Sequence, residues 1–163
     1  MTRCAWAILV FIALVQFSGC SRGDPYANSY TTKQPKQKDV AGVYLLVDQT
    51  ITQGGLSILK GQQCILVLLA DGSFQATNYP RWTAPGNIKQ LTALASVQGR
   101  WQCDTVGSVD NGLTMQKCWG INFSGADHEI DGLNLTGQSP PYGLIMGYGD
   151  PDSGEVMIFE KKK

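Results

Sequence analysis

The stretch Cys64-Ile65-Leu66-Val67-Leu68-Leu69-Ala70-Asp71-Gly72-Ser73-Phe74 decides the fold class of this chain. It begins with six apolar residues, which is the length of a strand, and Asp71-Gly72 follows after one alanine. Asp-Gly between two apolar segments is among the strongest short hairpin signals, because Gly adopts the positive φ that the turn requires. Residues 73–79 then return with apolar and polar side chains in alternation. The stretch therefore predicts two antiparallel strands joined by a tight turn.

Strand patterns recur on both sides of this hairpin. They cover residues 40–47, 56–59, 98–104, 113–123, 133–136, 142–148 and 155–160. Glycine is frequent (19 residues), which favours β-structure with tight turns. Short strands at regular spacing, without a long crossover segment, predict a mainly β fold. We expect an antiparallel up-and-down barrel of about eight strands, with a β-sandwich as the alternative.

One segment, residues 87–95, has the pattern of a short helix. Asn87 can cap its amino end, with Gln90 three residues later as the reciprocal partner, and apolar residues recur on one face. Pro80 is expected to end the preceding strand. A helix this short is stable only when it packs on the sheet.

The chain opens with an apolar leader. Arg3 supplies a positive amino-terminal region, and residues 5–17 are apolar except for Gln16. This run is too short to span a bilayer with ordinary flanks, which takes about 20 residues. A charged start, a short apolar core and small residues at its end are typical of an export signal.

The end of the leader, Ser18-Gly19-Cys20, resembles the lipobox of bacterial lipoproteins. The resemblance implies a signal peptide at residues 1–19, cleavage before Cys20 and a lipid on that cysteine. Ser21 after the cysteine implies the outer membrane, facing the periplasm, in a cell with two membranes. The alternative is a soluble secreted protein cut near Gly19, with an ordinary thiol at Cys20.

Residues 21–39 are polar and predict a flexible tether. Its apolar residues are only Tyr26, Ala27 and Tyr30. These three side chains cannot bury enough apolar surface to order the segment. A flexible coil of this length spans about 25 Å. We therefore expect three parts: a signal peptide at 1–19, a lipidated cysteine and tether at 20–39, and a β-barrel domain at 40–163.

The domain at 40–163 resembles the small lipocalin-like (calycin) barrels of bacterial lipoproteins. The motifs that carry the resemblance are Gly42-Val43-Tyr44, Leu69-Ala70-Asp71-Gly72-Ser73-Phe74, Gly99-Arg100-Trp101 and Phe159-Glu160-Lys161. The resemblance implies a barrel, in proteins whose role is unknown.

Three cysteines remain after the leader and Cys20. Counting outward from a turn at Val109-Asp110-Asn111-Gly112 places Cys103 opposite Cys118. Directly opposed residues bring their Cβ atoms close enough for a disulfide, so we expect a Cys103–Cys118 bond. Cys64 would then be a buried free thiol; the alternative pairs Cys64 with one of the other two.

The charge balance excludes a nucleic-acid-binding class. Removal of residues 1–19 takes away Arg3, which leaves 12 of the 13 Lys and Arg against 13 Asp and Glu. A net charge near −1 gives no electrostatic footprint for nucleic acid. It also predicts no basic face for anionic lipid.

No motif for catalysis or metal binding stands out. His128, the one histidine, lies in an acidic loop, and zinc sites want three or four N or S ligands. The acidic segment 150–155 lacks the EF-hand pattern and is interpreted as a turn. Neither a nucleophile elbow nor a P-loop is present. We expect no enzymatic activity, no cofactor and no metal.

Trp82, Trp101 and Trp119 are the candidate contact residues. Aromatic side chains either line a small apolar pocket or fill the interior, because eight-stranded barrels are about wide enough for their own side chains. Arg81-Trp82 is either an exposed binding anchor or a cover for one end of the barrel. The sequence thus predicts a non-catalytic binding domain for a small apolar ligand or an envelope protein. The alternative is an inhibitor or immunity-like protein for an exported enzyme.

Overall fold

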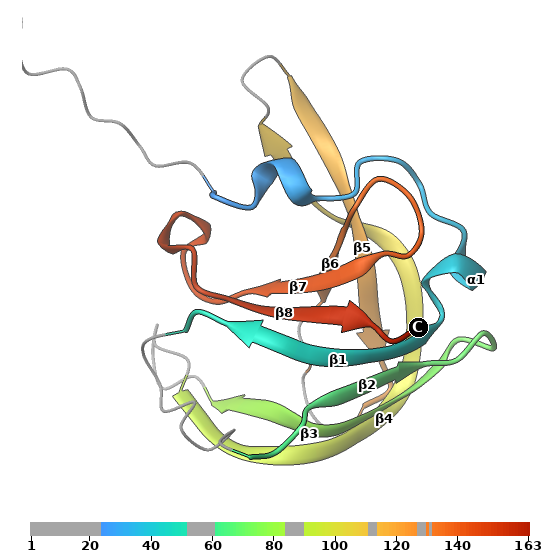
Figure 1. Ribbon diagram of the computed structural model, residues 1–163, viewed down its shortest axis with the longest axis vertical. Coiled ribbons are helices and arrows are strands. Elements are labelled where there is room, and N and C mark those ends of the chain that lie inside the picture. The colour runs from blue at the N-terminus through green and yellow to red at the C-terminus, as the bar shows by residue number, and fades with distance from the viewer. Residues whose placement is uncertain (1–23, 52–60, 84–89, 111–113, 127–129, 131) are drawn as a thin grey trace, which may run out of the picture.

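The computed structural model describes residues 24–163 except 52–60, 84–89, 111–113, 127–129 and 131. Eight antiparallel strands close into a barrel, and each pairs with its neighbours in sequence (Figure 1). The strands are β1 (Gly42–Gln49), β2 (Ile65–Leu68), β3 (Ser73–Thr83), β4 (Gln90–Asp110), β5 (Met115–Ser124), β6 (Leu133–Thr136), β7 (Gly143–Gly147) and β8 (Val156–Lys161). The helical elements are η1 (Ala27–Ser29), α1 (Gln37–Val40) and η3 (Pro151–Ser153). The predicted fold class, an up-and-down barrel of eight strands, is confirmed, and the described part contains one short α-helix, α1.

The turn between β2 and β3 forms where Asp71-Gly72 predicts it. Gly72 adopts a φ of 81°, and its N–H donates to the Leu69 carbonyl over 3.0 Å. The Asp71 carboxylate accepts a bond from the Ser73 N–H at 2.8 Å. The turn is therefore stabilised by Gly72, which tolerates a positive φ, and by the Asp71 carboxylate, which accepts a hydrogen bond from the first residue of β3.

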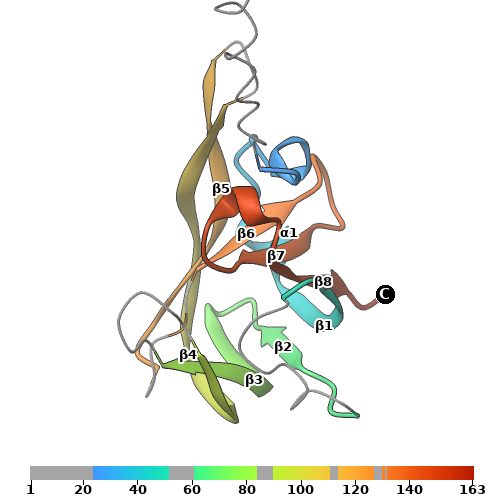
Figure 2. The same ribbon diagram turned by 90° about the vertical axis from the view of Figure 1, so that its left-hand side faces the viewer.

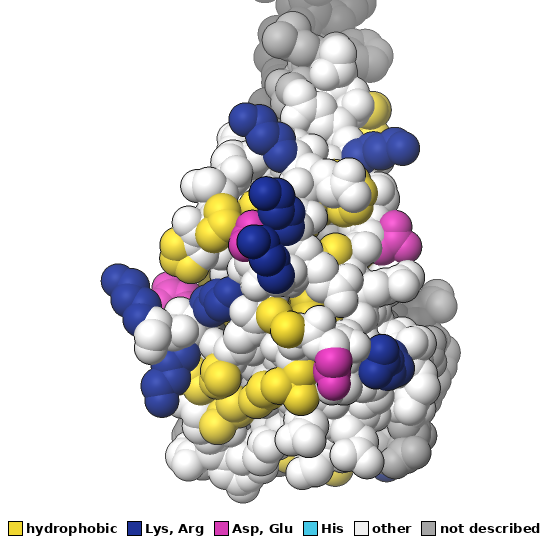
Figure 3. Space-filling model, turned by 90° about the vertical axis from the view of Figure 1, so that its right-hand side faces the viewer, with side chains coloured by type: hydrophobic (Ala, Val, Ile, Leu, Met, Phe, Trp, Pro, Cys, Tyr) yellow, Lys and Arg dark blue, Asp and Glu magenta, His cyan; other side chains and the backbone are white. Residues whose placement is uncertain are grey.

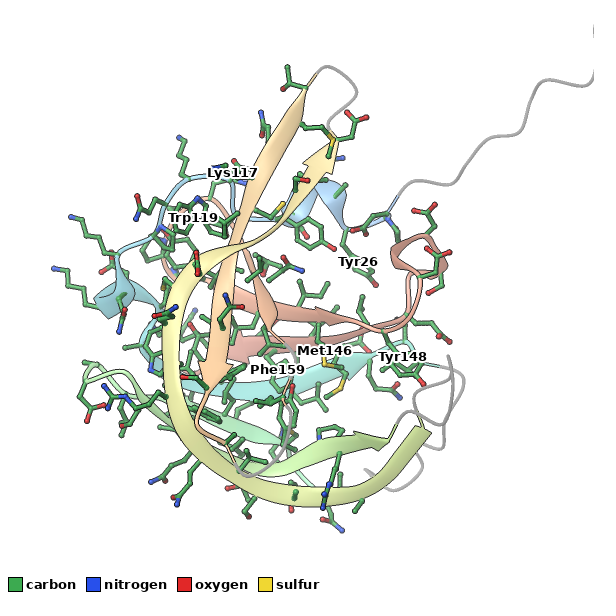
Figure 4. The ribbon with its side chains drawn as sticks, turned by 180° about the vertical axis from the view of Figure 1, so that it is seen from behind. Tyr26, Lys117, Trp119, Met146, Tyr148 and Phe159 are labelled. Carbon is green, nitrogen blue, oxygen red and sulfur yellow. The ribbon has the colours of Figure 1, made fainter. Side chains whose placement is uncertain are left out.

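The inner faces of the strands form one core of buried side chains. On β2 and β6 every second residue is buried, as the period of a half-buried strand requires. Tyr44, Phe74 and Phe159 are the largest fully buried side chains. The Phe74 ring lies 4.6 Å from that of Phe123, and Met146 and Phe159 lie on the inner side of β7 and β8 (Figure 4). Each such side chain contributes roughly 1.5–3 kcal/mol by leaving water.

The helix α1 packs against the barrel core through Val40. Val40 is fully buried, and its carbonyl accepts a bond from the Tyr44 hydroxyl at 2.6 Å. Lys161 from β8 lies 5.9 Å from the centre of the Tyr44 ring and donates to the Asp39 carbonyl at 2.8 Å. A Cβ on Gly42 would lie 2.4 Å from the Lys161 side chain, so the glycine of the Gly-x-aromatic motif makes room for this lysine.

The predicted helix at residues 87–95 is wrong over its described part. Residues 90–95 belong to β4, and Leu91, Leu94 and Ala95 pair with β3. Partners on β3 exist because that strand does not end at Pro80, which pairs with Leu94. β2 pairs with β3 only as far as Thr77, so within the described residues Pro80 has a partner strand on one side, a position where proline is tolerated. Cross-strand pairing thus overrides the helix propensity of Leu and Ala.

The predicted flexible tether is also wrong over its described part. Residues 24–40, called the strap below, lie along the barrel (Figures 1 and 2). Thr31 is fully buried, its N–H donates to the Leu135 carbonyl and its carbonyl accepts from the Trp119 N–H, both at 2.9 Å. Tyr30 forms a β-bridge with Thr136. The strap is ordered by backbone hydrogen bonds to β5 and β6, which its polar composition does not reveal.

The expected Cys103–Cys118 disulfide is wrong because the register of the β4–β5 hairpin differs from the count. The last described pair is Asp110 with Met115, which puts the turn about two residues later than predicted. Cys118 therefore lies opposite Gly107, and Cys103 opposite Ile121. Three positions of β5, from Cys118 to Ile121, separate the two cysteines by on the order of 10 Å, too far for a disulfide. Cys64, Cys103 and Cys118 are free thiols.

Part of the β4–β5 hairpin extends beyond the barrel wall (Figures 1 and 2). β5 pairs with β6 only through Gly120 and Ile121; residues 105–110 of β4 and 115–118 of β5 are called the projecting hairpin below. Val106 is the extra residue of a bulge in β4. A Cβ on Gly120 would lie 2.5 Å from Val106, so a glycine is needed where the hairpin leaves the wall.

Candidate functional site

The structure does not bring the three predicted tryptophans together. Trp101 is 3% exposed in the core, and its indole N–H donates to the Leu69 carbonyl at 2.9 Å. Trp119 is half-buried against the core and is seen on β5 in Figure 4. Trp82 pairs with Leu91 on β4, and its side chain lies outside the described part. Trp101 and Trp119 therefore build the barrel.

Two further predicted residues lie outside the described part of the chain. These are Cys20, the expected lipid site, and His128. Among the residues that the structure describes, no three His, Cys, Asp or Glu side chains are grouped to hold a metal ion. No helix within that same part has the length and apolar character that crossing a membrane requires.

A groove of about 410 Å³ lies between the strap, the projecting hairpin and the β7–β8 connection. It is lined by Asp24, Ala27, Tyr30, Val106, Gly107, Ser108, Val109, Asp110, Cys118, Asn134, Gly147, Asp152, Glu155 and Val156. Its size falls within the range of small-molecule and side-chain pockets. The groove lies outside the barrel, because Cys118 and Val156 are buried there without belonging to the barrel core.

All charged residues that line the groove are acidic. They are Asp24 of the strap, Asp110 of the projecting hairpin, and Asp152 and Glu155 of the β7–β8 connection. Ala27, Val109 and Val156 add aliphatic lining between them. An acidic rim over an aliphatic floor suits an extended cationic segment, because its Lys or Arg side chains have an apolar stem and a charged head.

The hydroxyl of Tyr30 holds the side chain of Asp24, the first residue of the strap. It donates a short hydrogen bond to the Asp24 carboxylate, which also accepts from the Tyr26 N–H at 2.8 Å. Burial, and then the Asp24 bond, raises the pKa of Tyr30. Tyr30 therefore stays protonated and keeps Asp24 oriented toward the groove at ordinary pH.

The thiols of the described part are not activated. Burial raises the pKa of Cys64 to about 12 and that of Cys103 to about 11. Burial, and then the charge of Asp24, raises the pKa of Cys118 in the groove. Since the thiolate is the nucleophile, these cysteines are poor candidates for covalent catalysis. The groove is therefore a candidate for binding.

Sequence reasoning missed the groove. Its acidic residues read as parts of a tether and of surface turns, and no local motif unites them. They form one surface only because the strap pairs with β5 and β6. The apolar count of a segment cannot show that pairing, because it depends on a strand edge more than a hundred residues away.

Comparison with known proteins adds no assignment, since family models, curated proteins and solved structures all give no match to this chain.

Proposed function

We propose that this protein is a lipid-anchored, non-catalytic binding protein of the bacterial envelope. Its lipid is carried by Cys20, and its barrel is held close to the membrane, where the groove binds an envelope protein. The ordered strap is the observation that carries this proposal. The export leader and the residues Ser18-Gly19-Cys20 support the lipid anchor.

The strap shortens the distance between the lipid and the barrel. Asp24, four residues after Cys20, is already held by hydrogen bonds to Tyr26 and Tyr30. Four residues span at most about 14 Å when fully extended, whereas a flexible tether of residues 21–39 would span about 25 Å. The barrel and its groove would therefore stay next to the membrane surface.

The packed interior favours a protein partner over a small apolar ligand. The inner side chains of the described strands form one cluster with little exposed surface, including Tyr44, Tyr79 and Phe159. The groove lies on the outside of the barrel, beside the projecting hairpin. A protein partner with a basic segment fits its acidic rim.

The projecting hairpin supports a second candidate, an inhibitor or immunity-like protein for an exported enzyme. Met115, near its tip, is 65% exposed, and an exposed large apolar side chain on a protruding element suits insertion into a partner's cleft. Met115→Asp would weaken such a complex and leave groove binding unchanged.

The anchor is tested by mass spectrometry of the amino-terminal peptide from bacterial membranes. We expect a chain that begins at Cys20 and carries acyl groups, and a Cys20→Ser variant without them. An unmodified Cys20 on a soluble product would overturn the anchor.

The groove is tested by photo-crosslinking in living cells. A photoreactive residue replaces Val109 in the groove or, as the control, the exposed Gln75 on the outer face of β3. We expect one discrete product from position 109 that disappears when Asp152 and Glu155 are changed to Lys. Equal products from both positions, or a product that survives charge reversal, would contradict binding in the groove.

A further inference from the structure

Charge is strongly segregated on this nearly neutral molecule. Residues 33–40 and 160–163 carry six lysines against Asp39 and Glu160, a net charge of +4. The remaining described residues carry three basic side chains against eight acidic ones. The net charge of −1 over these described residues therefore conceals a basic face, called the lysine face below. The expectation of no basic face is wrong, because a sum over the chain does not say where the charges lie.

The fold brings the two basic segments together from opposite ends of the domain. The Lys161 ammonium donates to the Asp39 carbonyl at 2.8 Å, across 122 positions of sequence. The Lys162 N–H donates to the Val43 carbonyl at 2.7 Å, which places the next residues beside β1. Figure 3 shows the resulting collection of Lys and Arg side chains on the side of the molecule that carries α1.

Five of the six lysines are free to meet a partner. They are the exposed residues Lys33, Lys36, Lys38, Lys162 and Lys163. Lys161 is half-buried, and it is committed to Asp39 and the Tyr44 ring. The lysine face is therefore a set of exposed ammonium groups around one structural lysine.

Aliphatic side chains lie next to the lysine face. Val43 pairs with Val67, and Leu45 with Ile65, on the outer faces of β1 and β2. These four are half-buried, and Leu69 at the end of β2 is 43% exposed. Hydrophobic side chains are visible on the same side in Figure 3. Ammonium groups beside aliphatic ones match a lipid headgroup region, where both kinds of contact are available.

We propose that the lysine face binds the headgroups of anionic phospholipids and sets the orientation of the barrel on the membrane. The proposal rests on the lipid anchor of the proposed function, because attraction to anionic headgroups acts only within about 10 Å at 0.1 M salt. The strap supplies that proximity: it starts four residues after Cys20 and carries Lys33, Lys36 and Lys38 along the barrel.

The test uses the lipid-bearing protein purified from membranes and reconstituted in vesicles. One set is phosphatidylcholine alone, and the other contains 30 mol % phosphatidylglycerol. Acetylation rates of individual lysines are measured by mass spectrometry. We expect Lys33, Lys36, Lys38, Lys162 and Lys163 to react at least fivefold more slowly in the anionic vesicles, and 1 M NaCl to remove the difference. Lys117, on the projecting hairpin, should react equally in both.

A charge-neutralised variant shows whether the lysines act together. In Lys36→Gln/Lys38→Gln/Lys162→Gln/Lys163→Gln, the remaining Lys33 should lose its protection, whereas Lys117→Gln should leave it unchanged. All five replaced side chains are exposed, so thermal unfolding should be unaltered, which checks that the fold persists.

The outcomes separate the two proposals. Vesicle-bound protein with equal lysine rates in both compositions would overturn the lysine face and leave the anchor standing. Protection in neutral vesicles as strong as in anionic ones would likewise overturn recognition of anionic headgroups. Protein that does not associate with either vesicle would overturn the anchor and, with it, this inference.

Discussion

The burial of the strap and of the projecting hairpin is the reverse of what their sequences predict. The strap is polar, yet Thr31 and Val40 within it are fully buried. The projecting hairpin consists of paired β-strands, yet Ser108, Asp110 and Met115 are exposed. The strap is held because its backbone bonds to two strands of the barrel, whereas the hairpin bonds mainly within itself. Attachment to the wall therefore decides which segment is integral to the barrel.

Among the strap, the projecting hairpin and their junction with the wall, the largest loss of stability is expected at the junction. In Gly120→Ala the new Cβ would lie 2.2 Å from the Leu133 carbonyl oxygen and 2.5 Å from Val106. Overpacking against backbone should lower the free energy of unfolding by about 3 kcal/mol. Urea denaturation measures this change in the free energy of unfolding. Gly107→Ala is the control, since nothing lies within 4 Å of its Cβ. Similar losses in both variants would show that the junction is not tightly packed.

A smaller loss in the free energy of unfolding is expected from a substitution within the strap. Thr31→Val removes a buried hydroxyl that donates to the Gly137 carbonyl, which leaves that carbonyl without this partner and should cost about 1–2 kcal/mol. The neighbouring Thr32→Val removes only an exposed, 3.3 Å contact to Gln138 and should change stability by less than about 0.5 kcal/mol. Equal behaviour of the two variants would mean that the strap contributes little to the barrel.

Thiol labelling sharpens the comparison by reporting local opening. Cys118 lines the groove beside the strap, whereas Cys64 lies in the barrel core. Burial raises the pKa of both, so at pH 8 labelling requires opening that returns each thiol to water. Thr31→Val should speed labelling of Cys118 by about tenfold and leave Cys64 within about twofold. Acceleration of both thiols together would mean that the strap and barrel open as one unit.

The smallest effect is expected at the tip of the projecting hairpin. Met115 is 65% exposed, so Met115→Ser should change the free energy of unfolding by less than about 0.5 kcal/mol. Phe159→Ala in the core should cost about 3–5 kcal/mol in the same urea assay. A loss above about 1 kcal/mol from Met115→Ser would show that the hairpin is packed against something in solution.

The success and failure of the sequence-based expectations follow the range of the interactions involved. Asp71-Gly72 and the alternation around it act between neighbours, and the predicted hairpin is confirmed. The predicted pairing of Cys103 with Cys118 depends on the position of the turn. One bulge at Val106 and a later turn change the register of the hairpin, so the two cysteines are not opposite each other. Prediction of the candidate groove failed for the same reason, since Asp24 and Glu155 meet only through the tertiary structure.

The sequence by itself determined the barrel and its order of strands. Alternation of period two marks which face of each strand is apolar, and short turns leave each strand beside its predecessor. Only the tertiary structure decided that the strap belongs to the wall, that residues 90–95 are a strand and that the basic carboxyl-terminal segment lies beside α1. Backbone N–H groups bond to whichever strand edge lies within reach, and charges act through space, so neither is determined by the residues next to them in the chain.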